Sequence, residues 1–416
     1  MKKILYISDY TFDVYNSVND ILYNIVAAPA IDKFENIIVR LDGRRRFPYD
    51  IKNYYNKYKT YTAPEQNFHH LLRNNEYSFF ERVRCLYRRI LFSVANRRDK
   101  VAEFEKSDNI KYIDSIIKRE KPDLVVFYIY VPNTDYIDIC IKRKVPYISI
   151  LYDTYIERPG LDIKTGMARE KYVIENSKAH IVPSFFYDGY VKYYNNAKVK
   201  KFDLPLLIDK ISVQQAYQKA DVKYDFTYFG QIQSFRNGDK IKDLFRTLGL
   251  KLDVFSSMHY ESDDVYTVHR ALTQNDLYKV VAGSKFLVAL DNSAPYNDYL
   301  PSKAYLYSSF TKPVIAFGDN KDSALKRFFK DYPSFYYQDI NEPMDGLIQF
   351  INRAKEDQFD ENIYNNYLAY LPENALVPLI EIIENIMTEK GWTKRISANK
   401  GAYPFYIFDL LSRYIC

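Results

Sequence analysis

Cysteine and histidine are scarce in this chain of 416 residues, which contains three of the former and five of the latter. Cys85, Cys140 and Cys416 lie far apart and form neither a Cys-x-x-Cys pair nor a Cys/His cluster with ligand spacing. We therefore expect neither a disulfide framework nor a structural zinc site, and the cysteine usage fits a reducing cytoplasm.

Long hydrophobic runs are also missing. The best one, Leu124 to Val131, is far shorter than the about 20 apolar residues that a membrane-spanning helix needs. The N-terminal segment MKKILYISDYTFD places a run of only four apolar residues after its lysines, which is too short for a signal peptide. We expect no membrane span, and we interpret residues 4–8 as a first β-strand.

No charge of one sign dominates the chain, whose formal net charge is +6. Arginines are concentrated in segment 79–100, FFERVRCLYRRILFSVANRRDK, where apolar residues recur at helical spacing. This pattern predicts a basic amphipathic helix. The helix either packs on its own domain with a solvated basic face or attaches to an anionic membrane surface. No nucleic-acid-binding motif accompanies the charge, so nucleic acid is not an expected partner.

Strand and helix patterns alternate along the first half of the chain. Apolar strands separated by helical stretches predict a parallel, doubly wound sheet, which we assign to an N-terminal Rossmann-like domain of residues 1–205. A helix is expected from Ser17, its N-cap, to Ala28. The expected strands are 4–8, 37–41, 124–130, 147–152 and 179–183.

A proline and a polar run in LPLLIDKISVQQAYQKADVKY interrupt this alternation, and a second series follows. We assign it to a C-terminal Rossmann-like domain of residues 206–372. Its expected strands are 226–229, 251–255, 266–269, 286–290, 313–316 and 335–337, and its expected helices are 238–248, 274–282, 302–310 and 321–330. Ligands bind such sheets at the carboxyl ends of the strands, so the fold class is α/β with two Rossmann-like domains facing across a cleft.

Two motifs in the second half of the sequence resemble those of a known protein family. LPSKAYLYSSFTKPVIAFGD resembles the donor-site signature of GT-B glycosyltransferases, and YFGQIQSFRNG is similar to the glycine and basic-residue loop that opens their C-terminal domain. The resemblance is to the family 4-like group with a degenerate Glu-x7-Glu motif, because the two glutamate positions hold Asp298 and Leu306. It implies a last helix, in residues 373–416, that crosses back to the N-terminal domain. The donor-binding residues that it implies are Gly230, Arg236, Asp298, Ser302 and Lys303.

Sugar transfer from a nucleotide requires stabilisation of a leaving diphosphate, by either a divalent metal or fixed cations and helix dipoles. The chain contains no Asp-x-Asp sequence, and its nearest analogue, Glu261-Ser262-Asp263, lies in a polar stretch where solvated charge is the simpler interpretation. We therefore expect no metal and no cofactor, and we expect Arg236 and Lys303 to bind the diphosphate. Each residue has a simpler alternative interpretation. For Arg236 it is an exposed loop arginine, and for Lys303 it is a solvated lysine at the start of a helix.

An inverting reaction would need a general base, for which Asp9 and Asp153 are the candidates because each follows an expected strand. Both residues have the alternative role of capping a turn. No histidine is assigned to catalysis: His180 begins a strand and is interpreted as structural, whereas His269 has no partner in the sequence pattern.

The predicted function is transfer of a hexose from a nucleotide diphosphate sugar to a hydroxyl of a glycan or lipid-linked glycan, as in surface polysaccharide biosynthesis. The predicted location is the cytoplasm, with peripheral attachment to the inner face of the cell membrane as one option. Segment 79–100 and the tail from Trp392 to Cys416, which joins basic and aromatic residues, would provide that attachment. Two alternatives of other classes remain open, a nucleotide-sugar epimerase and a non-catalytic GT-B partner subunit.

Overall fold

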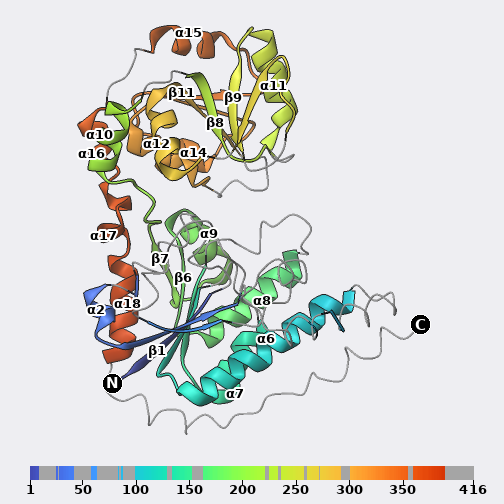
Figure 1. The fold of residues 1–416 in the computed structure, drawn as a ribbon, viewed down its shortest axis with the longest axis vertical. Coiled ribbons are helices and arrows are strands. Elements are labelled where there is room, and N and C mark those ends of the chain that lie inside the picture. Colours follow the sequence, from blue (N-terminus) through green and yellow to red (C-terminus); the bar gives the residue numbers. More distant parts are fainter. Residues whose placement is uncertain are drawn as a thin grey trace.

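The computed structural model describes most of the chain as two α/β units, one above the other in Figure 1. The described residues are 1–8, 25–26, 28–41, 58–62, 83, 86–87, 99–128, 134–151, 163–220, 224–232, 236–256, 260–270, 272–291, 300–354 and 359–388.

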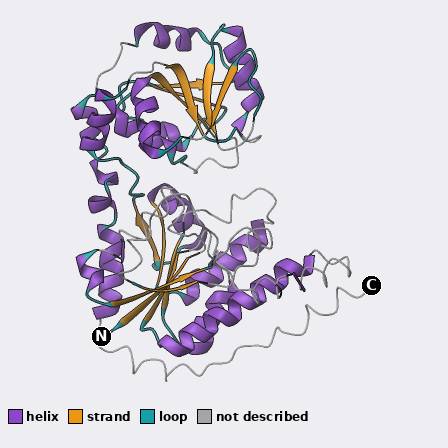
Figure 2. Cartoon of the chain, in the orientation of Figure 1, coloured by secondary structure: helices purple, strands orange, loops and turns teal. Residues whose placement is uncertain are grey.

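The first unit is built on a seven-stranded parallel sheet with the order β3-β2-β1-β4-β5-β6-β7. Its strands are β1 (Lys3–Ser8), β2 (Glu35–Arg40), β3 (Lys59–Thr62), β4 (Leu124–Tyr128), β5 (Tyr147–Ile150), β6 (Ala179–Pro183) and β7 (Val199–Phe202). Its helices are α2 (Pro29–Asp32), α6 (Asp99–Glu120), α7 (Thr134–Arg143), α8 (Ile163–Asn176) and α9 (Ser184–Tyr194). Strands β4 and β6 are buried along their whole length because helices cover both faces of the sheet, as Figure 2 shows.

The second unit contains a six-stranded parallel sheet with the order β10-β9-β8-β11-β12-β13. Its strands are β8 (Tyr224–Phe229), β9 (Leu252–Ser256), β10 (Tyr266–Arg270), β11 (Ser284–Leu290), β12 (Val314–Gly318) and β13 (Phe335–Asp339). Its helices are α10 (Lys210–Gln218), α11 (Gly238–Thr247), α12 (Gln274–Gly283), α13 (Lys303–Phe310), α14 (Ala324–Phe328), α15 (Asp345–Arg353) and α16 (Glu361–Asn365).

Two stretches of chain connect the units. In the first, between β7 and α10, the Ile208 N–H donates to Ser309 Oγ at 3.0 Å and the Ile208 carbonyl accepts from the Tyr364 hydroxyl at 2.8 Å. The second contains the short helices η2 (Leu368–Tyr370) and α17 (Pro372–Ala375), followed by α18 (Val377–Thr388). Helix α18 returns to the first unit, where it packs against α2 and β7 (Figure 1).

The expected strands are confirmed within one to three residues wherever the structure describes them, and two strands, β3 and β7, were not predicted. The expected helix 321–330 is shorter, because α14 spans only Ala324–Phe328. The expected helix 17–28 and the tail after residue 388 lie almost entirely outside the described residues, and the proposed domain boundaries stay predictions. Within the described part of the chain, none of the helices has the length and apolar character required to cross a membrane.

Candidate functional site

Buried polar side chains gather where β11 and β12 end. Asp291, the residue after β11, is 2% exposed and accepts a 2.8 Å hydrogen bond from the Tyr337 hydroxyl. Asn320 lies two residues after β12, is 6% exposed, and donates its backbone N–H to the same hydroxyl at 3.2 Å. The carboxyl ends of parallel strands share one edge of a sheet, and ligands of such sheets bind there. This polar edge is therefore where a ligand of the second unit is expected.

Two cations meet at the same edge, on the hydroxyl of Tyr228. Lys303 Nζ donates to that hydroxyl at 3.1 Å and an Arg236 nitrogen donates to it at 3.3 Å, whereas the hydroxyl itself donates to the Gln231 carbonyl at 2.8 Å. The ammonium group also lies 4.5 Å from the centre of the Tyr228 ring, a cation–π contact. Arg236 is only 8% exposed, so the interpretation of this residue as an exposed loop arginine is wrong.

Gly230 permits this close arrangement. Its φ of +126° lies in a region that L side chains rarely adopt, and a Cβ placed there would lie 3.0 Å from Lys303 Nζ. The Gly230 N–H continues the sheet by donating to the Phe255 carbonyl at 2.9 Å. A glycine at this position therefore lets the chain leave β8 and pass directly against the ammonium group.

Lys303 occupies the first position of α13, where the helix dipole disfavours a cation. Burial of the ammonium group and, secondarily, the positive charge of Arg236 lower the pKa of Lys303 well below its ordinary value. Among the residues that the structure describes, no carboxylate forms an ion pair with Lys303. Ser302, which precedes the helix, is exposed and its side chain caps no backbone N–H. An anion bound here would relieve each of these electrostatic conflicts.

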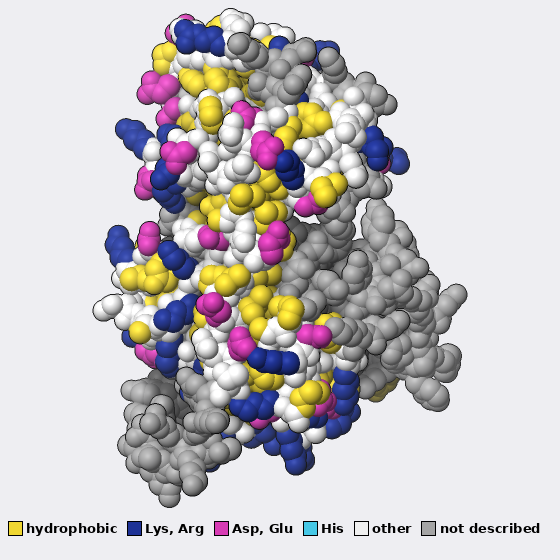
Figure 3. Space-filling model, turned by 90° about the vertical axis from the view of Figure 1, so that its left-hand side faces the viewer, with side chains coloured by type: hydrophobic (Ala, Val, Ile, Leu, Met, Phe, Trp, Pro, Cys, Tyr) yellow, Lys and Arg dark blue, Asp and Glu magenta, His cyan; other side chains and the backbone are white. Residues whose placement is uncertain are grey.

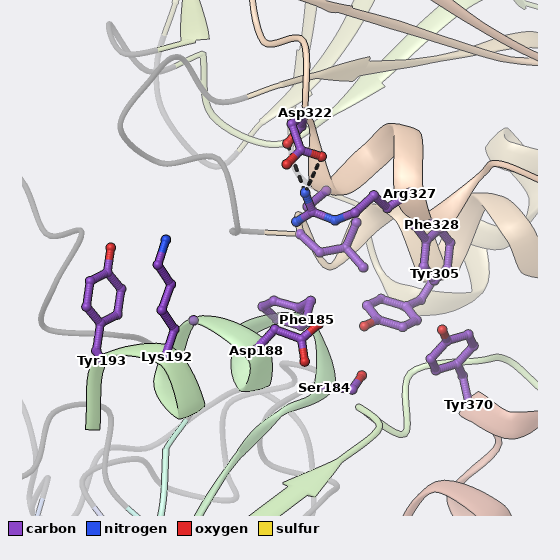
Figure 4. Close-up of a pocket in the computed structure, with 13 residues that line it drawn as sticks. Ser184, Phe185, Asp188, Lys192, Tyr193, Tyr305, Asp322, Arg327, Phe328 and Tyr370 are labelled. Atoms are coloured by element: carbon purple, nitrogen blue, oxygen red, sulfur yellow. Dashed lines mark hydrogen bonds and ion pairs between the residues drawn. The ribbon is translucent and has the colours of Figure 1, made fainter. Parts of the chain in front are cut away.

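A cavity of 520 Å³ lies between the two units, next to α13 (Figure 4). One side is formed by α9 of the first unit, which contributes Asp188, Lys192 and Tyr193. The other side is formed by the second unit, which contributes Tyr305 of α13 and Arg327 of α14. The volume is within the range of about 300–1,000 Å³ that is common for small-molecule sites.

The structure brings together three of the predicted donor-site residues, Gly230, Arg236 and Lys303, and places Ser302 beside them. The other three predicted site residues, Asp9, Asp153 and Asp298, lie outside the described residues. Tyr228 was not predicted, because a tyrosine in a buried strand gives no sign in the sequence of what its hydroxyl binds.

The structure also shows the surroundings of two histidines, His180 and His269, and of the residues that could bind a metal ion. His180 is fully buried, its Nδ1 lies 2.7 Å from Ser149 Oγ, and burial lowers its pKa to about 3, as fits a structural residue. His269 was expected to lack a partner, but its Nε2 lies 2.7 Å from Asp253 Oδ1 on the neighbouring strand. Within the described ranges, no group of three or more His, Cys, Asp or Glu residues could hold a metal ion.

No protein-family model matches the chain, and no curated protein matches it significantly in sequence. Solved structures do match. Sucrose-phosphate synthase from Thermosynechococcus elongatus has a TM-score of 0.62 at 11% identity, over 93% of this chain and 99% of that one. Anabaena HepE in complex with UDP has a TM-score of 0.58 at 11% identity, over 94% of this chain and 100% of that one.

These matches span both units and nearly the full length of each chain. This chain has the GT-B fold. A third structure, UDP-N-acetylglucosamine 2-epimerase from Rickettsia bellii, has a TM-score of 0.52 at 12% identity, over 95% of this chain and 100% of that one. Because identities of this order show the fold alone, the activity of this GT-B protein has to be argued from its site.

Proposed function

We propose that the protein is a glycosyltransferase that moves a hexose from a nucleotide diphosphate sugar to a hydroxyl of an acceptor. The observation that carries the proposal is the convergence of Arg236 and Lys303 on one tyrosine hydroxyl, at the carboxyl edge of the second sheet. Two cations held this close repel each other, so their juxtaposition favours an anionic ligand with more than one charge. A nucleoside diphosphate is such a ligand, and the structure of HepE, which has this fold, is a complex with UDP.

The same two cations account for the chemistry. Negative charge develops on the leaving diphosphate as the bond to the sugar breaks, and preorganised cations stabilise that charge without a metal ion. Gly230 lets the backbone approach the phosphates, and the positive end of the α13 dipole at Ser302 favours an anion there. Asp298 is the proposed partner of the donor sugar hydroxyls, which completes the donor set.

The acceptor side of the proposal rests on the sequence. A glycan or lipid-linked glycan of a surface polysaccharide is the proposed acceptor, with Asp9 or Asp153 as the base that removes a proton from its hydroxyl if the reaction inverts configuration. Residues 79–100 and the tail would attach the protein to an anionic membrane surface on the cytoplasmic side. Three apolar side chains of that segment, Val83, Leu86 and Tyr87, are exposed, which favours attachment over packing on the first unit.

A nucleotide-sugar epimerase is the second candidate, because one structure of this fold is a UDP-N-acetylglucosamine 2-epimerase. A non-catalytic partner subunit is the third. Radiolabelled nucleotide sugars distinguish the three: turnover that depends on an added acceptor and resists EDTA indicates metal-independent transfer, whereas release of an epimer indicates the second activity. A chain that binds no donor would be a partner subunit.

Charge removal at the two cations tests the donor site directly. We expect the double substitution Arg236→Gln and Lys303→Gln to weaken UDP binding at least about 100-fold, since a charged hydrogen bond contributes roughly 1.5–3 kcal/mol. Isothermal titration calorimetry measures the effect. Lys240→Gln, an exposed lysine of α11 in the same unit, is the matched control and should leave the affinity unchanged. Unchanged UDP affinity in the double variant would refute the proposed function.

A further inference from the structure

The amine of Lys303 is held beside a second cation. Lys303 Nζ and an Arg236 nitrogen donate to the same Tyr228 hydroxyl, at 3.1 and 3.3 Å, so the two groups are no further apart than two hydrogen bonds. Among the described residues, no carboxylate forms an ion pair with this amine. Lys59 is the opposite case, because its ammonium group donates to both carboxylate oxygens of Glu120 at 2.9 Å. The two lysines should therefore differ in how easily they lose a proton.

This difference makes Lys303 a candidate nucleophile. Burial and, secondarily, the charge of Arg236 lower the pKa of Lys303. The hydrogen bond to Glu120 raises the pKa of Lys59 instead. A lowered pKa leaves more of the amine neutral near pH 7, and the neutral amine is the form that attacks an electrophilic carbon. Desolvation next to another cation is one of the ways in which proteins activate a lysine.

The same surroundings select an anionic reagent. The guanidinium group of Arg236 is permanently charged, and the dipole of α13, whose first residue is Lys303, favours an anion at this end. An acyl phosphate carries a phosphate group and an electrophilic acyl carbon joined through one oxygen atom. With its phosphate on Arg236, its acyl carbon would lie within reach of the neighbouring amine. Lys303 is only partly buried as a residue, which leaves an approach for a small molecule.

We propose that Lys303 is a site of covalent acylation by small acyl phosphates, and that this modification closes the proposed donor site. The neutral amine attacks the acyl carbon and forms a carbon–nitrogen bond. The bond between the acyl carbon and the phosphate oxygen breaks, inorganic phosphate leaves with the electron pair, and the nitrogen gives its extra proton to solvent. The product is an amide, and no oxidant or reductant takes part.

The amide would impair the donor site in two ways. It carries no charge, so the proposed diphosphate would lose one of its two cations. It also needs space, and a Cβ at Gly230 would lie only 3.0 Å from Lys303 Nζ, so an acyl group on this nitrogen would crowd the loop after β8. The closing of the donor site rests on the proposed function, whereas the acylation itself does not.

Acetylation of the whole protein with acetyl phosphate near neutral pH tests the selectivity. Peptide mass spectrometry follows all lysines in one sample. We expect Lys303 to be acetylated at least about tenfold faster than Lys240, an exposed lysine of α11. Lys59, whose side chain is 49% exposed, should be slower than both because its amine is paired. Acetylation of Lys303 at the rate of Lys240, or more slowly, would overturn the proposal.

Arg236→Gln tests whether the phosphate group guides the reagent. We expect this variant to acetylate Lys303 about tenfold more slowly with acetyl phosphate, and to show a smaller effect with acetic anhydride, which has no phosphate. Arg246→Gln, which changes an exposed arginine of α11 paired with Asp264, is the matched control and should leave the rate unchanged. A slow reaction at Lys59 in each variant verifies that the fold is intact. Equal slowing with both reagents would contradict the role of Arg236.

UDP separates this proposal from the proposed function. We expect saturating UDP to protect Lys303 from acetylation without protecting Lys240, and the acetylated protein to lose UDP affinity at least about tenfold. Treatment with acetyl phosphate should cause no such loss in Lys303→Arg, which has no amine to acylate. Unselective acetylation of a protein that binds UDP would refute this inference alone. Selective acetylation of Lys303 without protection by UDP would refute the proposed donor site and leave the acylation site standing.

Discussion

Tyr228 contacts both cations of the proposed donor site. Its side chain is fully buried, and its hydroxyl makes three hydrogen bonds, accepting from Lys303 and Arg236 and donating to Gln231. The hydroxyl is a neutral acceptor, and it holds the two basic side chains next to each other. This arrangement is the one that the proposed diphosphate site requires.

Gly230→Ala should damage both stability and donor binding. A Cβ at φ +126° is strained and would contact Lys303 Nζ, so we expect a loss of roughly 1–3 kcal/mol in unfolding free energy and a displaced ammonium group. Chemical denaturation and UDP titration measure the two effects. Gly249→Ala is the control, because Gly249 also has a positive φ, +64°, but nothing lies within 4 Å of its Cβ position. Equal UDP affinity in both variants would contradict the role of Gly230.

The elements of this fold differ in how far the sequence predicts them. Strand β4, LVVFY, is buried along its whole length, so its continuous apolar run identifies it. Strand β3, with the sequence KTYT, has no such run and is defined by its pairing with β2. Strand β7 exposes its two central lysines, as edge strands commonly do to prevent aggregation, and its sequence VKKF therefore reads as a loop.

The donor site was predictable only in part for a similar reason. The loop after β8 and the start of α13 carry local patterns, which placed Gly230, Arg236 and Lys303 in the site. The contacts of Tyr228 depend on partners 8 and 75 residues away along the chain, and no local pattern contains them. The same holds for the cavity, whose two sides come from elements more than 100 residues apart.

Helix α13 gives the donor site a dependence on pH. In the free protein, burial lowers the pKa of Lys303 and so makes its charged form less favourable than that of an exposed lysine, and a bound diphosphate would raise that pKa again. At a pH between these two pKa values, UDP binding should therefore take up a proton, and UDP affinity should fall as pH rises through the lower one. Above about pH 8 the nucleotide phosphates are already ionised and contribute no proton of their own.

Titration calorimetry in two buffers of different ionisation enthalpy measures this proton uptake. Lys303→Arg provides the comparison, because an arginine stays charged at every accessible pH. We expect this variant to bind UDP without taking up a proton. Proton uptake of equal size in the variant and in the native protein would show that another group titrates.

At the scale of the whole molecule, one face can be followed in Figure 3. On this face, which includes α10, α16 and α18, the basic and acidic side chains of the described residues are interspersed around a band of hydrophobic ones. The densest run of arginines in the sequence is segment 79–100, which falls within the predicted N-terminal domain. A proposed membrane contact therefore involves that segment and leaves the mixed-charge face in water.

Attachment to anionic membranes should depend on the exposed apolar residues of this segment. Val83, Leu86 and Tyr87 are 43%, 42% and 62% exposed, and their spacing of three and four residues places them on one helix face. We expect Leu86→Glu with Tyr87→Glu to reduce co-sedimentation with phosphatidylglycerol vesicles roughly tenfold at low salt, since both apolar burial and charge attraction are lost. The control variant is Ile348→Glu, which changes an equally exposed isoleucine of α15 in the second unit. We expect it to co-sediment with the vesicles as well as the native protein does. Equal sedimentation with pure phosphatidylcholine, or of the double variant, would mean that the basic segment does not bind the bilayer.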